Sequence, residues 1–175
     1  MMDARAYCEW AHTGQLRKYT NEPYHNHPHR VADMVRTAGA SEDAVVAAYH
    51  HDVLEDTPVT EKEYKDRWGE RVFNMVWALT TIKRPGENRA ARKTREMNRL
   101  SWSPSEVATI KLADLLDNTN DILQYDPDFA KQYIREKADL LSVLGHGHRG
   151  LLIRATQQVQ RYMEQLDDTQ DSRKD

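Results

Sequence analysis

The sequence predicts an all-α protein, a single compact bundle of several helices. Apolar residues recur at spacings of three and four along almost all of the 175 residues. No segment alternates apolar and polar residues as a half-buried strand does, and no Asn-Gly hairpin turn occurs. Only seven glycines and six prolines interrupt the chain, which suits long helices. We expect one domain over residues 1–166, followed by a polar tail over 167–175 that frays.

Glycine, proline and serine set the boundaries of the first three predicted helices. Gly14 follows the first helix, whose apolar face has helical spacing. Pro28 begins the second helix and Gly39 ends it. Ser41 is an N-cap, and the helix after it continues through a His-Asp pair. These signals predict helices over residues 3–12, 28–38 and 42–54.

The same signals divide the rest of the chain. Gly69 separates two helices, and a Pro-Gly pair marks a loop over 83–88. Ser103, Pro104 and Glu106 together form a helix start with a serine N-cap. The remaining predicted helices cover residues 60–69, 70–82, 89–100, 104–123, 127–144 and 151–166.

The composition excludes several classes of function. The chain has 28 acidic and 25 basic residues, a net charge of −3, which disfavours nucleic-acid binding. Its one cysteine, Cys8, excludes an intramolecular disulfide framework and a zinc site built from cysteines. No apolar run is long enough for a membrane span, and the first residues do not resemble a signal peptide. We expect a cytoplasmic protein without nucleic-acid or membrane partners; the oligomeric state is left open.

The most informative segment is His50-His51-Asp52-Val53-Leu54-Glu55-Asp56. On a helix, residues three and four apart share a face, so His51 and Asp52 would neighbour Glu55 and Asp56. Crowded carboxylates repel one another, and a bound divalent cation would neutralise them. The alternative is a solvated acidic helix end. The apolar run just before it favours a position for His51 and Asp52 at the edge of the core, where polar groups need partners.

Two other positions have the chemistry of metal ligands. Asp114 interrupts an apolar helix, and if it faces inward it needs a cation or hydrogen-bond donors. Asn118 lies one turn later on the same face, and the alternative for Asp114 is a surface pair with Lys111. His27 precedes Pro28, which favours an extended and fixed conformation, although an ordinary polar loop remains the alternative.

Taken together, His27, the His51-Asp52 pair and the distant Asp114 match the H…HD…D signature of HD-domain metal-dependent phosphohydrolases. Within that superfamily, the chain resembles the hydrolase domain of RelA/SpoT-type alarmone enzymes from about Ala4 to Tyr133. The matching blocks, in order, are residues 11–18, 23–32, 51–57, 68–69 and 111–114. The resemblance implies an all-α HD-domain bundle and a small, stand-alone alarmone hydrolase.

The resemblance also implies the site. Its metal ligands would be His27, His51, Asp52 and Asp114. The family uses Mn²⁺, and mixed nitrogen and oxygen ligands also suit Fe²⁺, Zn²⁺ or Mg²⁺. Glu55 and Asp56 match the acidic pair that orients the attacking water or accepts its proton. The implied substrate contacts are Arg17, Lys18, Asn118 and Tyr133.

The implied reaction is hydrolysis of the 3′-pyrophosphate of ppGpp or pppGpp to GDP or GTP and pyrophosphate, with water as nucleophile. The sequence departs from the family pattern at Leu115 and Asp117, where basic or aromatic residues are common. The departures leave fewer positive charges around the site. Basic residues over 83–99 either supply the missing charge or form a solvated face. One alternative is an HD-domain phosphatase of another nucleotide, such as NADPH. Another is a non-catalytic nucleotide-binding module, which the intact pair Glu55 and Asp56 disfavours.

Overall fold

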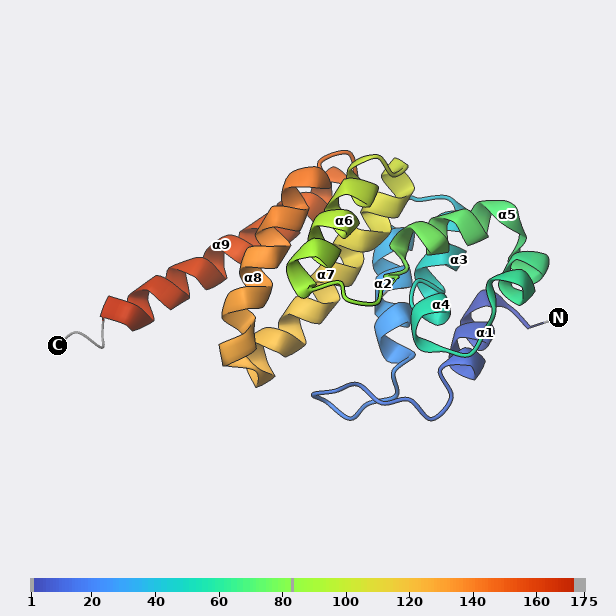
Figure 1. Cartoon of the computed structure of the whole chain (residues 1–175), viewed down its shortest axis with the longest axis horizontal. Helices are drawn as coiled ribbons and strands as arrows, with labels where there is room; N and C mark the ends of the chain where they lie inside the picture. Colours follow the sequence, from blue (N-terminus) through green and yellow to red (C-terminus); the bar gives the residue numbers. More distant parts are fainter. Residues whose placement is uncertain (1, 83, 172–175) are drawn as a thin grey trace.

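The protein is an all-α bundle, as predicted. The computed structural model describes residues 2–82 and 84–171, and within these ranges an isolated bridge between Leu16 and Pro23 is the only β pairing. Figure 1 shows the helices in chain order. They are α1 (Ala4–Ala11), α2 (Asn26–Thr37), α3 (Glu42–Tyr49), α4 (Val53–Asp56), α5 (Glu61–Leu79), α6 (Arg89–Ser101), α7 (Ser105–Tyr125), α8 (Pro127–Val143) and α9 (Arg149–Asp171).

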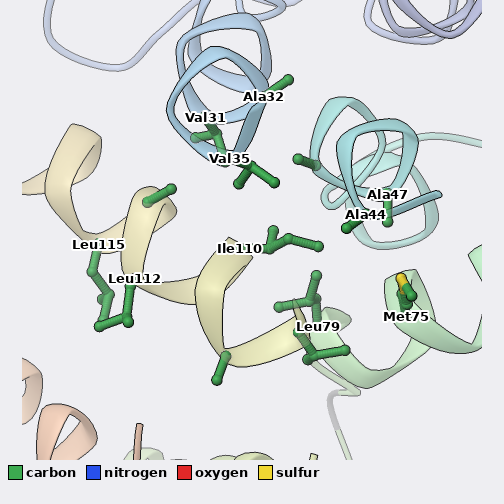
Figure 2. Close-up of a cluster of buried hydrophobic side chains, with 14 of the residues drawn as sticks. Val31, Ala32, Val35, Ala44, Ala47, Met75, Leu79, Ile110, Leu112 and Leu115 are labelled. Atoms are coloured by element: carbon green, nitrogen blue, oxygen red, sulfur yellow. The ribbon is translucent and has the colours of Figure 1, made fainter. Parts of the chain in front are cut away.

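Helices α2 and α7 lie in the middle of the molecule, with α1, α3, α4 and α5 toward one end and α8 and α9 toward the other (Figure 1). Helix α7 packs against α2, α3 and α5 on one side and against α8 and α9 on the other. In Figure 2, Ile110 of α7 lies between Val35 of α2 and Leu79 of α5. Burial of these apolar faces supplies the main drive for folding. Burial also fixes the positions of α2, α3 and α7, which hold the candidate site.

Several predicted boundaries are confirmed. The Ser41 side chain accepts a hydrogen bond from the Ala44 backbone N–H and so caps α3. Thr60 and Glu63 form a capping box at the start of α5. Gly69 has a φ of 80° and kinks α5 where the sequence predicted a break between two helices. A left-handed residue of this kind is accessible to glycine at little cost.

Two predictions near the candidate site are wrong. The predicted single helix through Leu54 instead ends at Tyr49, and His51 and Asp52 lie in the turn before α4. The side chains of both histidines in this turn are hydrogen-bonded to backbone carbonyls. His50 Nε2 lies 2.8 Å from the carbonyl of Ala4 in α1, and His51 Nδ1 lies 2.8 Å from the carbonyl of Ala48 in α3. Helix α2 also starts earlier than predicted, so His27 is helical rather than extended. Proline is compatible with a first helical turn because the N–H it lacks would have no partner there.

Two further boundaries also differ from prediction. Ser103 does not cap α7; its hydroxyl donates to the Leu100 carbonyl at the end of α6, and Pro104 takes the N-cap position. Helix α9 continues to Asp171, past its predicted end at residue 166, since no breaker interrupts it. Residues 172–175 of the predicted tail lie outside the described residues. Within the described ranges, no helix has both the length and the apolar character that a membrane crossing requires.

Candidate metal centre

Four side chains from three separate segments converge at the centre of the bundle. His27 comes from the first turn of α2, His51 and Asp52 from the turn after α3, and Asp114 from the middle of α7. The two Nε2 atoms lie 3.2 Å apart. Asp52 Oδ2 is 3.0 Å from His51 Nε2, and Asp114 Oδ1 is 3.3 Å from His27 Nε2. The structure therefore brings together all four residues that the H…HD…D pattern singled out.

The hydrogen bonds behind the two imidazoles show that this set fits a cation. His27 Nδ1 lies 2.7 Å from the Asp117 carboxylate, and His51 Nδ1 lies 2.8 Å from the Ala48 carbonyl. Both partners only accept hydrogen bonds, so each Nδ1 donates, and each Nε2 is the ring atom that faces the cluster and can serve as a metal donor. Two imidazole nitrogens and two carboxylate oxygens thus face one another. A divalent cation satisfies such a group of acceptors.

The electrostatics of the cluster agree with this reading. Burial lowers the pKa of the His51 imidazole, but the Asp52 and Asp114 carboxylates outweigh burial and raise that pKa well above its usual value. For Asp114, burial raises the pKa, whereas Lys111 and then the two imidazoles lower it well below the usual range. The cluster therefore attracts positive charge at a point that little solvent reaches.

A second layer of residues holds the ligands in place. Asp117 is 8% exposed; its carboxylate accepts from His27 and, at 2.6 Å, from Arg30 Nε. Lys111 Nζ donates to Asp114 Oδ2 at 2.9 Å, and the Tyr24 hydroxyl donates to Asp52 Oδ2 at 2.7 Å. Lys111 and Asp114 thus form the pair that the alternative proposed, but the pair is largely buried, with side chains 15% and 8% exposed, and Asp114 faces the cluster.

Sequence reasoning missed the positioning role of Asp117. The signal was present, because Asp114 and Asp117 are three residues apart on one helix and therefore share a face. Tyr24 and Lys111 also lie within the quoted motifs, yet their contacts depend on tertiary packing. Lys111 is held in turn by Glu96, a residue of α6 that is 4% exposed and lies 3.2 Å from the lysine.

The two acidic residues after the His-Asp pair point to different partners. Glu55 Oε2 accepts a hydrogen bond from the Thr81 backbone N–H at 2.7 Å. Desolvation raises the pKa of Glu55, the Thr81 N–H opposes that rise, and the Asp52 and Asp56 carboxylates add to it. Asp56 lies 3.4 Å from the Tyr24 hydroxyl, which also contacts Asp52. Asp56 is therefore linked to the cluster through Tyr24, and Glu55 interacts electrostatically with Asp52.

The four implied substrate contacts differ in position. Arg17 donates to Asn118 Oδ1 at 3.0 Å, and Asn118 donates to Asp114 Oδ1 at 2.6 Å, so both lie beside the cluster. Together with Lys18 they line a cavity of about 150 Å³. The Lys18 side chain is 74% exposed and points toward Asp126. Tyr133 lies deeper, with its hydroxyl 3.4 Å from Thr119 Oγ1, and it does not line this cavity.

The sequence model of the HD domain family matches residues 4–149, most of the chain. The chain belongs to the HD domain family. Hydrolases of this family depend on a metal ion, in agreement with the candidate site of His27, His51 and Asp114.

Relatives of this HD domain bear the names of enzymes that act on ppGpp. The guanosine-3′,5′-bis(diphosphate) 3′-pyrophosphohydrolase of Aquifex aeolicus is 32% identical over 134 residues, which cover 76% of this chain and 19% of that protein. The bifunctional (p)ppGpp synthase/hydrolase SpoT of Escherichia coli is 31% identical over 140 residues, 78% of this chain and 20% of the relative. The chain thus spans about a fifth of the length of these curated relatives.

A solved structure matches over almost its whole length. It is that of a metazoan ortholog of SpoT that hydrolyzes ppGpp, with a TM-score of 0.83 and 25% identity over 92% of this chain and 94% of that one. A protein of Listeria monocytogenes shares the fold, with a TM-score of 0.70 and 23% identity over 84% of this chain and 99% of that one.

The positions where this HD domain departs from the alarmone pattern have structural roles. Leu115 is buried in the core, and Asp117 orients His27. Three basic residues of the 83–99 region are already paired with acids and are not free to supply positive charge to the site. Arg89, Lys93 and Arg95 pair with Glu136, Glu96 and Glu87, respectively, and Lys83 lies outside the described residues.

Proposed function

We propose that this HD domain is a metal-dependent phosphohydrolase that releases pyrophosphate from the 3′ position of ppGpp or pppGpp, leaving GDP or GTP. The observation that carries the proposal is the convergence of two imidazole nitrogens and two carboxylates, with a carboxyl of raised pKa, Glu55, that interacts electrostatically with Asp52. The names of the curated relatives and the activity of the matching metazoan structure support this substrate. The composition and the single, buried Cys8 support a cytoplasmic location.

In this proposal His27, His51, Asp52 and Asp114 hold one divalent ion. Mn²⁺ is proposed first, and Fe²⁺, Zn²⁺ and Mg²⁺ are the other ions that this mixed donor set accepts. When bound, such an ion supplies Lewis-acid polarisation of a phosphoryl oxygen and a lower pKa for water. Asp117 keeps the Nδ1 proton of His27 in place, so that the opposite nitrogen remains a donor to the ion.

The remaining roles belong to residues around the ligands. Glu55 accepts a proton from the attacking water, a task for which a raised pKa suits a carboxylate. Asp56 helps to orient that water from the adjacent position. Arg17 and Asn118 bind the substrate next to the ligands, Lys18 attracts its phosphates from the exposed rim, and Tyr133 supports the pocket from α8.

One observation favours a second candidate, an HD-domain phosphatase of another nucleotide, such as NADPH. The Arg17 guanidinium is 2.6 Å from the Asp121 carboxylate and 3.8 Å from Asp117. Its positive charge is therefore already compensated by this chain, which weakens its attraction for a substrate with many phosphates. A nucleotide with fewer phosphates near the site requires less positive charge.

Product analysis separates these candidates. The Mn²⁺-loaded protein is incubated with ppGpp, NADPH and a panel of nucleoside phosphates, and the products are separated by chromatography. GDP with pyrophosphate supports the main proposal, and inorganic phosphate from NADPH supports the second candidate. Nucleotide binding without any product contradicts both and indicates a non-catalytic module.

Two variants test the roles of the residues. Asp52→Ala is expected to lose the metal ion, measured by elemental analysis after gel filtration. Glu55→Gln is expected to keep the ion and to lose rate by roughly 10²- to 10⁴-fold, the usual contribution of a general base. Glu164→Gln on the exposed surface of α9 is the matched control and leaves the rate unchanged. Normal turnover by Glu55→Gln contradicts the role given to Glu55.

A further inference from the structure

A groove between α2, α7 and α9 lies behind the metal centre. Its main cavity has a volume of about 470 Å³, and its lining includes Arg30, Leu116, Asn120, Arg154, Gln158 and Arg161. A neighbouring cavity of about 360 Å³ shares Asp33, Met34 and Arg154 with the first and adds the apolar side chains of Ala38 and Leu151. Asp117 lies at the boundary, since it lines the main cavity and also contacts His27.

The α9 side of this groove is polar and cationic. Residues 154, 157, 158 and 161 are spaced three, four and seven apart, so they share one face of α9. That face presents two arginines and two glutamines to the cavity. The adjacent face, with Leu151, Ala155 and Val159, is buried in the core and fixes the orientation of the helix.

Among the side chains that the structure describes, which on α9 end at residue 165, the two arginines of this face have no acidic partner. No ion pair joins Arg154 or Arg161 to a carboxylate of these described side chains, and the Arg161 Nε donates to the Gln157 carbonyl at 3.3 Å. The two acids of the lining have other partners. Asp33 pairs with Arg36 at 2.8 Å, and Asp117 is engaged by Arg30 and His27.

We propose that this groove is a second ligand site, distinct from the metal centre, that binds a small phosphorylated molecule with a ring system. The guanidinium groups of Arg154 and Arg161 provide charge-assisted donors for phosphate oxygens. The amide of Gln157 offers a donor and an acceptor for polar ring edges, and Asn120, whose oxygen accepts from Gln158 at 2.8 Å, offers its NH₂ group. Met34 and the adjoining apolar cavity give the ring a place to pack, and the combined volume is in the range of known ligand sites.

A methyl group in the groove reports on its occupancy. Met34 lines both cavities, whereas Met75 is buried in the core between other helices. In protein labelled with ¹³C at the methionine methyl groups, the Met34 signal is assigned with Met34→Leu, and GDP is added as the probe. EDTA is present throughout, so that no divalent ion draws the nucleotide to the metal centre. We expect a saturable shift of the Met34 signal and none of the Met75 signal.

Arginine variants localise the binding. Arg154→Gln and Arg161→Gln are each expected to weaken GDP binding at the Met34 reporter roughly tenfold, as the loss of a hydrogen bond to a charged group does. Arg149→Gln is the control, since it removes the same charge from an exposed position of α9 that does not line the groove. It should leave the affinity within twofold.

Two outcomes overturn the proposal. One is an unchanged Met34 signal at several millimolar GDP. The other is a shift whose affinity survives in both Arg154→Gln and Arg161→Gln, because the nucleotide would then bind elsewhere. Inorganic phosphate tests the ring subsite in the same titration. We expect it to bind at least tenfold more weakly than GDP, and equal affinity contradicts the apolar part of the site.

Discussion

The substitution Asp117→Asn tests whether the metal centre depends on the residue that orients His27. In the folded protein this carboxylate is 8% exposed and accepts hydrogen bonds from His27 Nδ1 at 2.7 Å and Arg30 Nε at 2.6 Å. Asparagine has nearly the same shape but no charge, and its amide nitrogen cannot accept from either partner. In the variant, the proton on His27 Nδ1 is therefore held less firmly, and the Nε2 atom is a weaker electron donor to a metal ion.

The expected magnitude follows from the position of Asp117. It contacts a ligand without being one, and removal of such a partner usually costs 10- to 100-fold in metal affinity. That range corresponds to about 1.4 to 2.7 kcal/mol of binding free energy. We expect a loss of affinity in the lower half of this range if the asparagine oxygen accepts from His27. We expect a loss in the upper half if that oxygen accepts from Arg30 instead.

The assay is isothermal titration of the metal-free protein with Mn²⁺ at pH 7.5, with circular dichroism to check that the variant is folded. Asp121→Asn is the matched control. It neutralises another α7 carboxylate one turn away, which pairs with Arg17 at 2.6 Å and contacts no histidine in the described structure. An Mn²⁺ affinity of Asp117→Asn within threefold of the wild type would refute this reasoning, and so would an equal loss in Asp121→Asn.

Two predictions concern stability. Burial lowers the pKa of Lys137 to about 7 from 10.5, so between these values the unfolded chain binds the proton more readily, and folding stability rises with pH. The wild type should gain about 2 to 3 kcal/mol between pH 7 and pH 9 in urea unfolding, whereas Lys137→Met should not; equal gains would contradict the burial argument. Gly69→Ala should cost about 1–3 kcal/mol, because alanine is strained at a φ of 80° and a ψ of 167° even though the space is open. Gly145→Ala, also in open space but without positive φ, should cost nothing measurable, and equal losses in the two variants would contradict the strain argument.

Local signals in the sequence predicted much of the fold because their physics is local. A serine N-cap, as at Ser41, needs only the next three residues, and a left-handed glycine, as at Gly69, needs only its own backbone. The wrong boundary at Leu54 has the opposite cause. His50 ends α3 with one ring nitrogen on Ala4 and the other on Tyr64, and neither contact is visible in the spacing of the segment.

The candidate site divides in the same way. The resemblance named the four converging residues, and the structure supplies the reason that they fit a cation, namely the acceptors behind His27 and His51. Periodicity on α7 could have assigned Asp117 to the face of Asp114. The contact of Glu55 with Thr81, in contrast, joins residues 26 apart in sequence and requires the packing of α4 against α5.

The fixed partners of the four converging residues explain how this core tolerates so many polar groups. Each of these residues has a hydrogen-bond partner outside the four-residue cluster. The partners are Asp117 for His27, the Ala48 carbonyl for His51, Tyr24 for Asp52 and Lys111 for Asp114. Those contacts restrict the side chains before any ion arrives, so little conformational entropy is lost on binding. The energetic cost of holding carboxylates close together is met during folding, by α2 and α7 packing on α3. Metal affinity and fold stability are therefore linked through the same three helices, and a substitution that loosens this packing should weaken both.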